Sequence, residues 1–341
     1  MTTDRPTPTL HDVADAADVS TATVSRCLNF PDKVAPKTRQ KVQDAIAALG
    51  YSPNFGAKVM AAKRTNTIGA IIPTMENAIF ARGLQAFQEE LRAHGYTMLV
   101  ASTAYQPNME EEQIRTLVAR GADALLLIGH ARAPSVYDFL RTQDVPTIVS
   151  WAYDPQGESP SVGFDNKAAM YAMAKQVLAQ GHVHLAAISA PTDQNDRASE
   201  RLSGIKAAMQ DAGLAPKKLH IIETPYSIEN GALAFAELMT KHPRPTAVFG
   251  GNDVLAIGAL RQAKTMQLAV PQDVSIVGFD DIELAQIADP ALTTVHVPHR
   301  EMGRKAALAL VNMLREGKSP PHLALDVEVV LRDTLGPVPR S

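Results

Sequence analysis

Charged, amide and aromatic side chains follow several apolar segments of this 341-residue chain. Ligands of parallel sheets bind beyond the carboxyl ends of the strands, so these positions are candidates for one binding cleft. Carboxylate, amide and guanidinium groups beside aromatic rings suit a polyhydroxylated ligand, whose hydroxyls pair with the polar groups while the rings cover its C–H face. The candidate residues are Thr74, Asn77, Phe80, Trp151, Asp165, Arg201, Asn252 and Asp280.

Arg197 precedes Arg201 by one helical turn, which places both guanidiniums on one face of the predicted helix. Two such groups suit a carboxylate, and this favours a sugar acid over a neutral sugar. Structural roles are the alternative. Asp280 and Asn252 can each cap the helix that follows, and Arg201 can pair with a nearby acid. Both interpretations stay open from the sequence.

We find no catalytic motif. The sequence has no G-x-S-x-G, no Walker phosphate loop, no G-x-G-x-x-G after a strand and no H-E-x-x-H. His182 and His184 are expected at the surface, and the adjacent Asp280 and Asp281 are expected to point in different directions. The single cysteine, Cys27, excludes an internal disulfide and a cysteine metal cluster, and we expect it in a small core. We therefore predict no catalytic residue, no cofactor and no metal.

Alternating strands and helices are expected to position the cleft residues. Apolar strands, each followed by a helix, predict parallel sheets covered on both faces, and the chain is long enough for two of them. The expected strands are 67–73, 96–102, 122–129, 145–151, 161–165, 184–190, 218–224, 245–251, 274–280 and 291–297. The expected helices are 78–94, 109–120, 134–141, 166–180, 197–212, 228–242, 253–266 and 300–315. After Pro290 the chain should return to the first sheet and end in a tail.

The first fifty residues have a different pattern, of three short helices. Thr9 and Ser20 are candidate N-caps, Pro36 opens the third helix and Gly50 ends it. Two helices joined by a tight turn, with a third closing the core, describe a helix-turn-helix unit, which lays its second helix in the DNA major groove. The expected helices are 10–17, 21–29 and 36–49.

Charge and composition fit a DNA-binding head on a globular body. Residues 1–64 carry nine basic and six acidic side chains, which leaves 24 basic and 30 acidic side chains for the rest of the chain. A basic head suggests a polyanionic partner for that part alone. No segment has the apolar h-region of a signal peptide or the roughly 18 apolar residues of a membrane span. We expect a cytoplasmic protein with no membrane partner.

The ordered segments resemble the lactose-repressor (LacI/GalR) family of bacterial transcription regulators over nearly the whole chain. The resemblance rests on several segments, which include "TLHDVADAADVSTATVSRCLN", "TIGAIIP", "GHVHLAAIS", "GGNDVLAIGAL", "VPQDVSIVGFDD" and "DPALTTV". The resemblance implies a small all-α helix-turn-helix headpiece and an α/β core of two parallel-sheet, Rossmann-like lobes, similar to periplasmic binding proteins. It implies a headpiece at 1–64 with a hinge at about 51–64, and a core at 65–341. The N-lobe would be about 65–163 and 293–330, and the C-lobe about 164–292.

In that family the second helix reads base edges, and its outward positions here are the expected readers. Arg26 suits guanine O6 and N7, a contact worth about 1–3 kcal/mol of discrimination. Met60 matches the hinge leucine that wedges into the minor groove, although Gly56 weakens so short a helix by about 1 kcal/mol. The expected base readers are Thr21, Ala22, Ser25 and Arg26, and the expected phosphate contacts are Thr23, Asn29 and Asn54.

In family members the positions matching Arg201, Asn252 and Asp280 contact the effector. The resemblance implies a homodimeric repressor that binds a two-fold double-stranded DNA operator under the control of a small sugar or sugar acid. "MENAIF", "AYQPNMEEEQIRTLV" and "SVGFDN" resemble the gluconate-responsive branch most. The tail lacks heptad leucines, so we expect dimers and no tetramers. The alternatives are a sugar-binding protein of the periplasmic-receptor fold without DNA function, and an enzyme.

Overall fold

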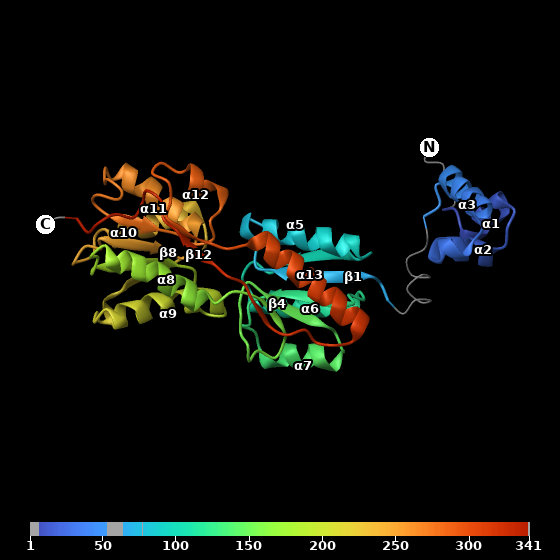
Figure 1. Cartoon of the computed structure of the whole chain (residues 1–341), viewed down its shortest axis with the longest axis horizontal. Coiled ribbons are helices and arrows are strands. Elements are labelled where there is room, and N and C mark those ends of the chain that lie inside the picture. Colours follow the sequence, from blue (N-terminus) through green and yellow to red (C-terminus); the bar gives the residue numbers. More distant parts are fainter. Residues whose placement is uncertain (1–6, 53–63, 77, 340–341) are drawn as a thin grey trace. The chain divides into compact units, whose positions relative to one another are not determined.

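The computed structural model describes residues 7–52, 64–76 and 78–339. The chain divides into two compact units, Met1–Thr65 and Asn66–Ser341 (Figure 1). The described elements of the first unit are α1 (Leu10–Ala17), α2 (Thr21–Asn29), the short 3-10 helix η1 (Pro31–Lys33) and α3 (Pro36–Leu49).

Local capping explains where the first two helices begin and end. Thr9 and Asp12 form a reciprocal capping box at the start of α1, and Asp18 ends that helix in the left-handed region. The Ser20 hydroxyl accepts a hydrogen bond from the Thr23 N–H and starts α2. These boundaries confirm the predicted helices. The core that the three helices enclose consists of Val13, Ala14, Ala17, Val24, Cys27, Val42, Ala45 and Tyr51.

Two parallel sheets form the second unit. The six-stranded sheet has the order β11-β5-β4-β3-β1-β2 and the four-stranded sheet the order β7-β6-β8-β9. The first contains β1 (Thr67–Ile72), β2 (Thr97–Ser102), β3 (Ala124–Ile128), β4 (Thr147–Ser150), β5 (Ser161–Gly163) and β11 (Leu323–Ala324). The second contains β6 (Leu185–Ser189), β7 (His220–Glu223), β8 (Ala247–Gly250) and β9 (Ser275–Val277).

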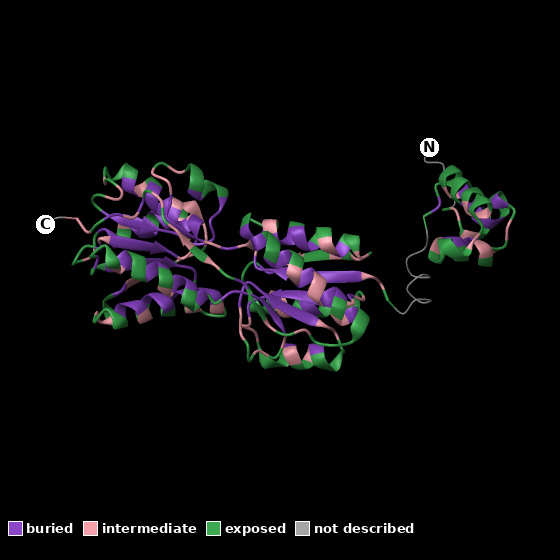
Figure 2. Ribbon diagram, in the orientation of Figure 1, coloured by how far each residue is buried: buried purple, intermediate pink, exposed green. Residues whose placement is uncertain are grey.

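Helices cover both faces of the inner strands of each sheet, which is why these strands are mostly apolar, whereas the residues of the edge strands β2 and β7 are exposed or half-buried (Figures 1 and 2). Ile68 of β1 packs in the cluster of α5 (Ala78–Ala93) and α13 (His299–Glu316), whereas Ile71 packs with residues of α6 (Pro107–Ala119) and α7 (Pro134–Thr142) on the other side. The second sheet lies between two further sets of helices. These are α8 (Asn166–Ala179) and α9 (Asp196–Asp211) on one face, and α10 (Ile228–Leu238), α11 (Asp253–Thr265) and α12 (Glu283–Ile287) on the other, with the short η2 (Pro216–Lys218) after α9.

We call the six-stranded sheet with α5, α6, α7 and α13 the first lobe, and the four-stranded sheet with α8 to α12 the second lobe. Between them β10 (Thr294–His296) pairs antiparallel with β12 (Glu328–Val330). The predicted return to the first sheet is confirmed by β11, which pairs with β5. The tail then packs on the second lobe, where the Thr334 carbonyl accepts a hydrogen bond from the Ile276 N–H.

Two local predictions were wrong. The helix expected over 228–242 ends at Leu238, because Pro243 has no N–H to donate to the Met239 carbonyl and cannot continue the helix. His182, expected at the surface, is fully buried under the tail. Its ring nitrogens lie 3.0 Å from Thr246 Oγ1 and 3.0 Å from the Gly336 carbonyl oxygen. Within the described ranges, no helix has the length and apolar character that crossing a membrane requires.

Candidate functional site

The outer face of α2 carries most of the predicted DNA contacts. Ala22, Arg26 and Asn29 are exposed, and the remaining predicted positions on this helix, Thr21, Thr23 and Ser25, are half-buried. The Asn29 amide donates to the Ser25 carbonyl at 3.0 Å, and the Thr23 hydroxyl lies 2.9 Å from the hydroxyl of the N-cap Ser20. Arg26 therefore points its guanidinium outward from a helix whose start and end are fixed locally. Asn54 and Met60 lie outside the described residues.

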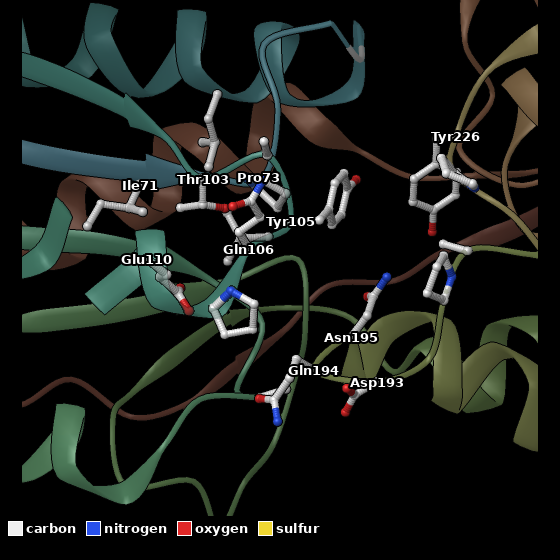
Figure 3. Close-up of a pocket in the computed structure, with 18 residues that line it drawn as sticks. Ile71, Pro73, Thr103, Tyr105, Gln106, Glu110, Asp193, Gln194, Asn195 and Tyr226 are labelled. Atoms are coloured by element: carbon white, nitrogen blue, oxygen red, sulfur yellow. The ribbon is translucent and has the colours of Figure 1, made fainter. Parts of the chain in front are cut away.

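The two lobes enclose a chamber of about 220 Å³ at the carboxyl ends of their strands (Figure 3). The first lobe contributes the ends of β1 and β3 and the loop after β2, and the second lobe the loops after β6 and β7. The residues labelled around it are Ile71, Pro73, Thr103, Tyr105, Gln106, Glu110, Asp193, Gln194, Asn195 and Tyr226.

Tyr105 and Tyr226 face each other across this chamber from opposite lobes (Figure 3). Their ring centroids are 5.7 Å apart, and the ring planes are inclined by 48°. Burial raises the pKa of both hydroxyls, so both are neutral at physiological pH. The side chain of Asn195 hydrogen-bonds to Tyr226 and also caps α9. The pair therefore offers aromatic faces and neutral hydroxyls to anything that enters between the lobes.

A second group of polar side chains, which we call the cleft floor, consists of Asp280, Arg201 and His299. Asp280 follows β9 and is 1% exposed, and neither of its carboxylate oxygens has a hydrogen-bond partner among the described residues. Oδ1 lies 3.8 Å from Arg201 Nη2 and 3.9 Å from His299 Nε2. These distances exceed a hydrogen bond, so the buried Asp280 carboxylate keeps unused acceptor positions beside a cation and an imidazole.

Burial sets the charges of the floor. It raises the pKa of the Asp280 carboxyl to about 7, against the opposing effect of Arg201 and Arg197. It lowers the pKa of His299 to about 3, so this ring is neutral. Near neutral pH the floor thus combines one cation, a carboxyl that is partly ionised, and a neutral imidazole. Such a mixture can donate and accept hydrogen bonds, as the hydroxyls of a polyol require.

Arg201 is held firmly. Its Nε donates to the Asn166 side chain at 2.8 Å and its Nη1 to the Gly251 carbonyl at 2.7 Å. Its guanidinium carbon lies 3.8 Å from the ring centroid of Phe279, a cation–π contact. Arg201 therefore pairs with an acid, Asp280, and leaves Nη2 directed at the floor. Of the two interpretations offered by the sequence, the structure shows the ion pair, and the effector contact of Arg201 stays a prediction.

Arg197 does not lie free beside Arg201. It is 9% exposed, and its Nη1 donates to the Ile128 carbonyl at 3.1 Å and to Asp196 Oδ1 at 3.0 Å. Asp196 also accepts a hydrogen bond from the backbone N–H of His130. Arg197 therefore connects α9 of the second lobe with the end of β3 in the first. These contacts occupy its Nη1, and the role of Arg197 as a second guanidinium for a carboxylate stays a prediction.

Most of the remaining predicted cleft residues pack in the core or cap helices. Trp151 is 1% exposed and packs against Phe80, with ring centroids 5.4 Å apart, and against His299 at 6.3 Å. Asp165 caps α8 and Asn252 caps α11 through their side-chain oxygens. Trp151 and Phe80 are part of the hydrophobic core beside the floor. Neither side chain lines the chamber. Asn77 lies outside the described residues, and Thr74 is half-buried after β1.

None of the described cleft residues predicted from the sequence lines the chamber, and sequence reasoning also missed His299 of the floor. Tyr105 and Tyr226 each lie three residues beyond a strand, β2 and β7, so the strand-end rule that selected Asp280 contained the signal for both. His299 begins α13, far along the chain from the other floor residues, and no local pattern distinguishes it.

Comparison with known proteins adds a second line of evidence. Residues 9–54 match the bacterial regulatory proteins of the lacI family, and residues 174–335 match a periplasmic binding protein-like domain. The HTH-type transcriptional repressor CytR of Escherichia coli K12 is 33% identical over 333 residues, covering 97% of each chain. The regulator GntR of the same strain is 31% identical over 95% of this chain and 97% of its own.

Solved structures agree with the fold. The lac repressor dimer bound to operator and the anti-inducer ONPF has a TM-score of 0.85 and is 25% identical over 97% of this chain and 99% of its own. The compared relatives are transcriptional regulators and not enzymes. A helix-turn-helix headpiece, a two-lobed α/β core and full-length similarity to these regulators lead to one conclusion: the chain belongs to the lacI family of DNA-binding bacterial transcriptional regulators.

Proposed function

We propose that this regulator changes its affinity for DNA when a small polyhydroxylated molecule binds the cleft floor. The observation that carries the proposal is the Asp280 carboxylate, which is buried, has no hydrogen-bond partner among the described residues and faces the Arg201 guanidinium at 3.8 Å. A buried carboxylate without a partner is costly, so its retention favours a ligand that supplies the missing hydrogen bonds. A vicinal diol, which donates to Asp280 and accepts from Arg201, fits this arrangement.

A neutral sugar fits the floor better than the gluconate-like acid that the sequence favoured. Arg197 already donates to the Ile128 carbonyl and to Asp196. Arg201 directs its Nη2 at the floor, where Asp280 lies 3.8 Å away. A carboxylate at this position would meet the repulsion of Asp280 once that group ionises. A sugar acid stays the second candidate, because protonation of Asp280 removes that repulsion.

In this proposal Thr21, Ala22, Ser25 and Arg26 read bases, and Thr23, Asn29 and Asn54 hold phosphates. Met60 enters the minor groove. Residues 1–64 serve as headpiece with hinge, and residues 65–341 as the effector and dimerisation core. The protein acts in the cytoplasm as a homodimer on a two-fold operator. The repressor-operator dimer among its structural relatives supports this assembly.

Fluorescence of Trp151, the single tryptophan, tests the effector site. The indole stacks on His299, so ligand at the floor is expected to change its emission. We expect a saturable change with a neutral sugar for the wild type and for Asp333→Asn, an exposed control, and none for Asp280→Asn. Equal affinity of Asp280→Asn and wild type would remove Asp280 from the site.

A further inference from the structure

Phe30 is the most exposed large apolar side chain in the described part of the first unit. It is 57% exposed, whereas Val24 and Cys27 of the preceding helix are buried in the core of the three helices. A phenylalanine ring in water forgoes the stabilisation that burial provides. The ring is therefore available for an apolar contact outside the headpiece.

Phe30 lies one turn beyond Arg26 at the end of α2. The predicted readers Ala22 and Arg26 are both exposed and four residues apart, so they share one row of the helix, and Phe30 continues this spacing. The Phe30 N–H donates to the Arg26 carbonyl at 2.8 Å, which fixes residue 30 against the last turn. Residue 30 thus continues the surface that α2 presents to DNA.

The chain that follows brings a cation to the ring. The 3-10 helix η1 folds it back, with the Lys33 N–H donating to the Phe30 carbonyl at 2.9 Å. Lys33 Nζ lies 5.3 Å from the centroid of the Phe30 ring, a cation–π contact. Asp32, between the two, lies 4.0 Å from Arg39 Nη1 of α3. An apolar ring beside an ammonium group suits DNA, in which apolar base edges lie beside phosphates.

We propose that Phe30 reads the 5-methyl group of a thymine near the base pair that Arg26 contacts, while Lys33 binds a phosphate beside it. This inference rests on the proposed contact of α2 with the major groove, and it adds a base preference through a residue that the sequence did not select. Thymine alone of the four DNA bases has a methyl group in that groove, and phenylalanine suits it. Cytosine in the same place would lose water from its amino group to an apolar ring.

Uracil tests the methyl group directly, because deoxyuridine differs from thymidine by that group alone. An operator is selected from random DNA duplexes with the full-length protein, and each thymine of one half-site is then replaced by uracil in turn. At one of these thymines we expect the wild type to lose about fourfold in affinity, which corresponds to one buried methyl group. Phe30→Ala should bind the thymine and uracil versions of that position equally.

Two further variants separate the ring from the cation. Phe30→Leu keeps an apolar side chain and should keep at least about a twofold preference for thymine over uracil. Lys33→Ala should weaken binding by the same factor on both operators, and should reduce the dependence of log affinity on log salt by about one per subunit. Lys41→Ala, at an exposed position of α3, should leave the preference for thymine at its wild-type value.

The outcomes distinguish this inference from the proposed function. If uracil is tolerated at every thymine, or if the loss persists in Phe30→Ala, Phe30 does not read a methyl group, and the proposed contact of α2 with DNA is unaffected. An equal loss of affinity by Phe30→Ala on every duplex would overturn the base preference in the same way. If the wild type selects no DNA sequence at all, the proposed readout by α2 fails, and the role of Phe30 fails with it.

Discussion

Asp280 and Asp281 both lie in the left-handed backbone region, at φ values of 109° and 53°. Such conformations cost a non-glycine residue roughly 1–3 kcal/mol and persist where the surrounding structure imposes them. Here they send two adjacent carboxylates to different partners, as the sequence predicted. Asp280 faces Arg201, and Asp281 accepts a hydrogen bond from Arg332 Nη2 at 2.6 Å. The strain therefore orients the carboxylate of the cleft floor.

Replacing Asp280 by asparagine should remove a pH dependence of stability. Burial raises the pKa of this carboxyl from 3.8 to about 7. The folded protein then binds the proton more tightly than the unfolded chain, so the contribution to stability is complete below about pH 4 and is lost as the pH rises through about 7. The loss is at most about 4 kcal/mol. Urea unfolding of wild type and Asp280→Asn between pH 4 and pH 8 measures it.

A second carboxyl titrates in the same range, since burial raises the pKa of Glu200 to about 7. Both proteins contain Glu200, so its contribution cancels in the difference between their unfolding free energies. That difference reports Asp280 together with its effect on the buried Asp253, whose pKa is raised by burial and by the charge of Asp280. Parallel pH profiles of the two proteins would show that the floor carboxyl ionises normally and would weaken its proposed role.

Arg26→Ala should reduce the preference for the operator over altered DNA sequences more than it reduces the affinity for DNA in general. The exposed guanidinium is placed to bind a guanine edge, a contact worth about 1–3 kcal/mol. Binding to an operator selected with the wild-type protein, and to versions with single G·C pairs replaced, is measured by fluorescence anisotropy. Lys41→Ala on α3 removes the same charge from an exposed position as a control. An equal loss on every DNA sequence would make Arg26 a phosphate contact.

At the scale of elements, the start of α9 joins the two lobes. Arg197 and Asp196 contact the segment from Ile128 to His130, at the end of β3. The approach leaves no room for a side chain on Gly129, where an added Cβ would lie 1.9 Å from Arg197 Nη1. Glycine is required there for its positive φ of 71° and for this close contact.

Gly129→Ala should therefore destabilise the core more than Gly213→Ala. Gly213 has nearly the same φ, 73°, but nothing lies within 4 Å of its added Cβ. Both variants have the backbone strain. Alanine at position 129 also displaces the Arg197 and Asp196 side chains from the Ile128 carbonyl and the His130 N–H, which costs roughly 1–3 kcal/mol more. Urea unfolding gives the difference, and ligand titration should show weaker effector binding for Gly129→Ala alone. Equal destabilisation of the two variants would mean that α9 and β3 separate easily.

The elements were predictable because their signals are local. Thr9, Ser20 and Gly50 determine helix ends within a few residues, and periodic apolar residues place most strands within one or two positions. The cleft was only partly predictable, because its contacts join distant segments. No local sequence pattern predicts that Arg197 donates to the Ile128 carbonyl, or that Trp151 packs in the core beside His299.

At the scale of the whole molecule, the basic head and the acidic body have separate tasks. Residues 1–64 hold nine basic and six acidic side chains, and the excess suits DNA. In the proposed function the core binds its ligand between lobes that α9 already connects, so ligand contacts with both lobes would alter how they pack. In the proposed dimer this change would act on both headpieces. The coupling must be reciprocal, since operator and effector act on one equilibrium.

The most direct test is to measure effector affinity of the full-length protein with and without saturating operator, and operator affinity with and without saturating effector. A neutral sugar that changes the Trp151 fluorescence serves as effector. The account predicts that the two ratios are equal and differ from one by about 5- to 150-fold. It also predicts that Asp280→Asn binds operator normally and does not respond to the ligand. An operator affinity that stays constant while the wild-type cleft fills would contradict the proposed control of DNA binding.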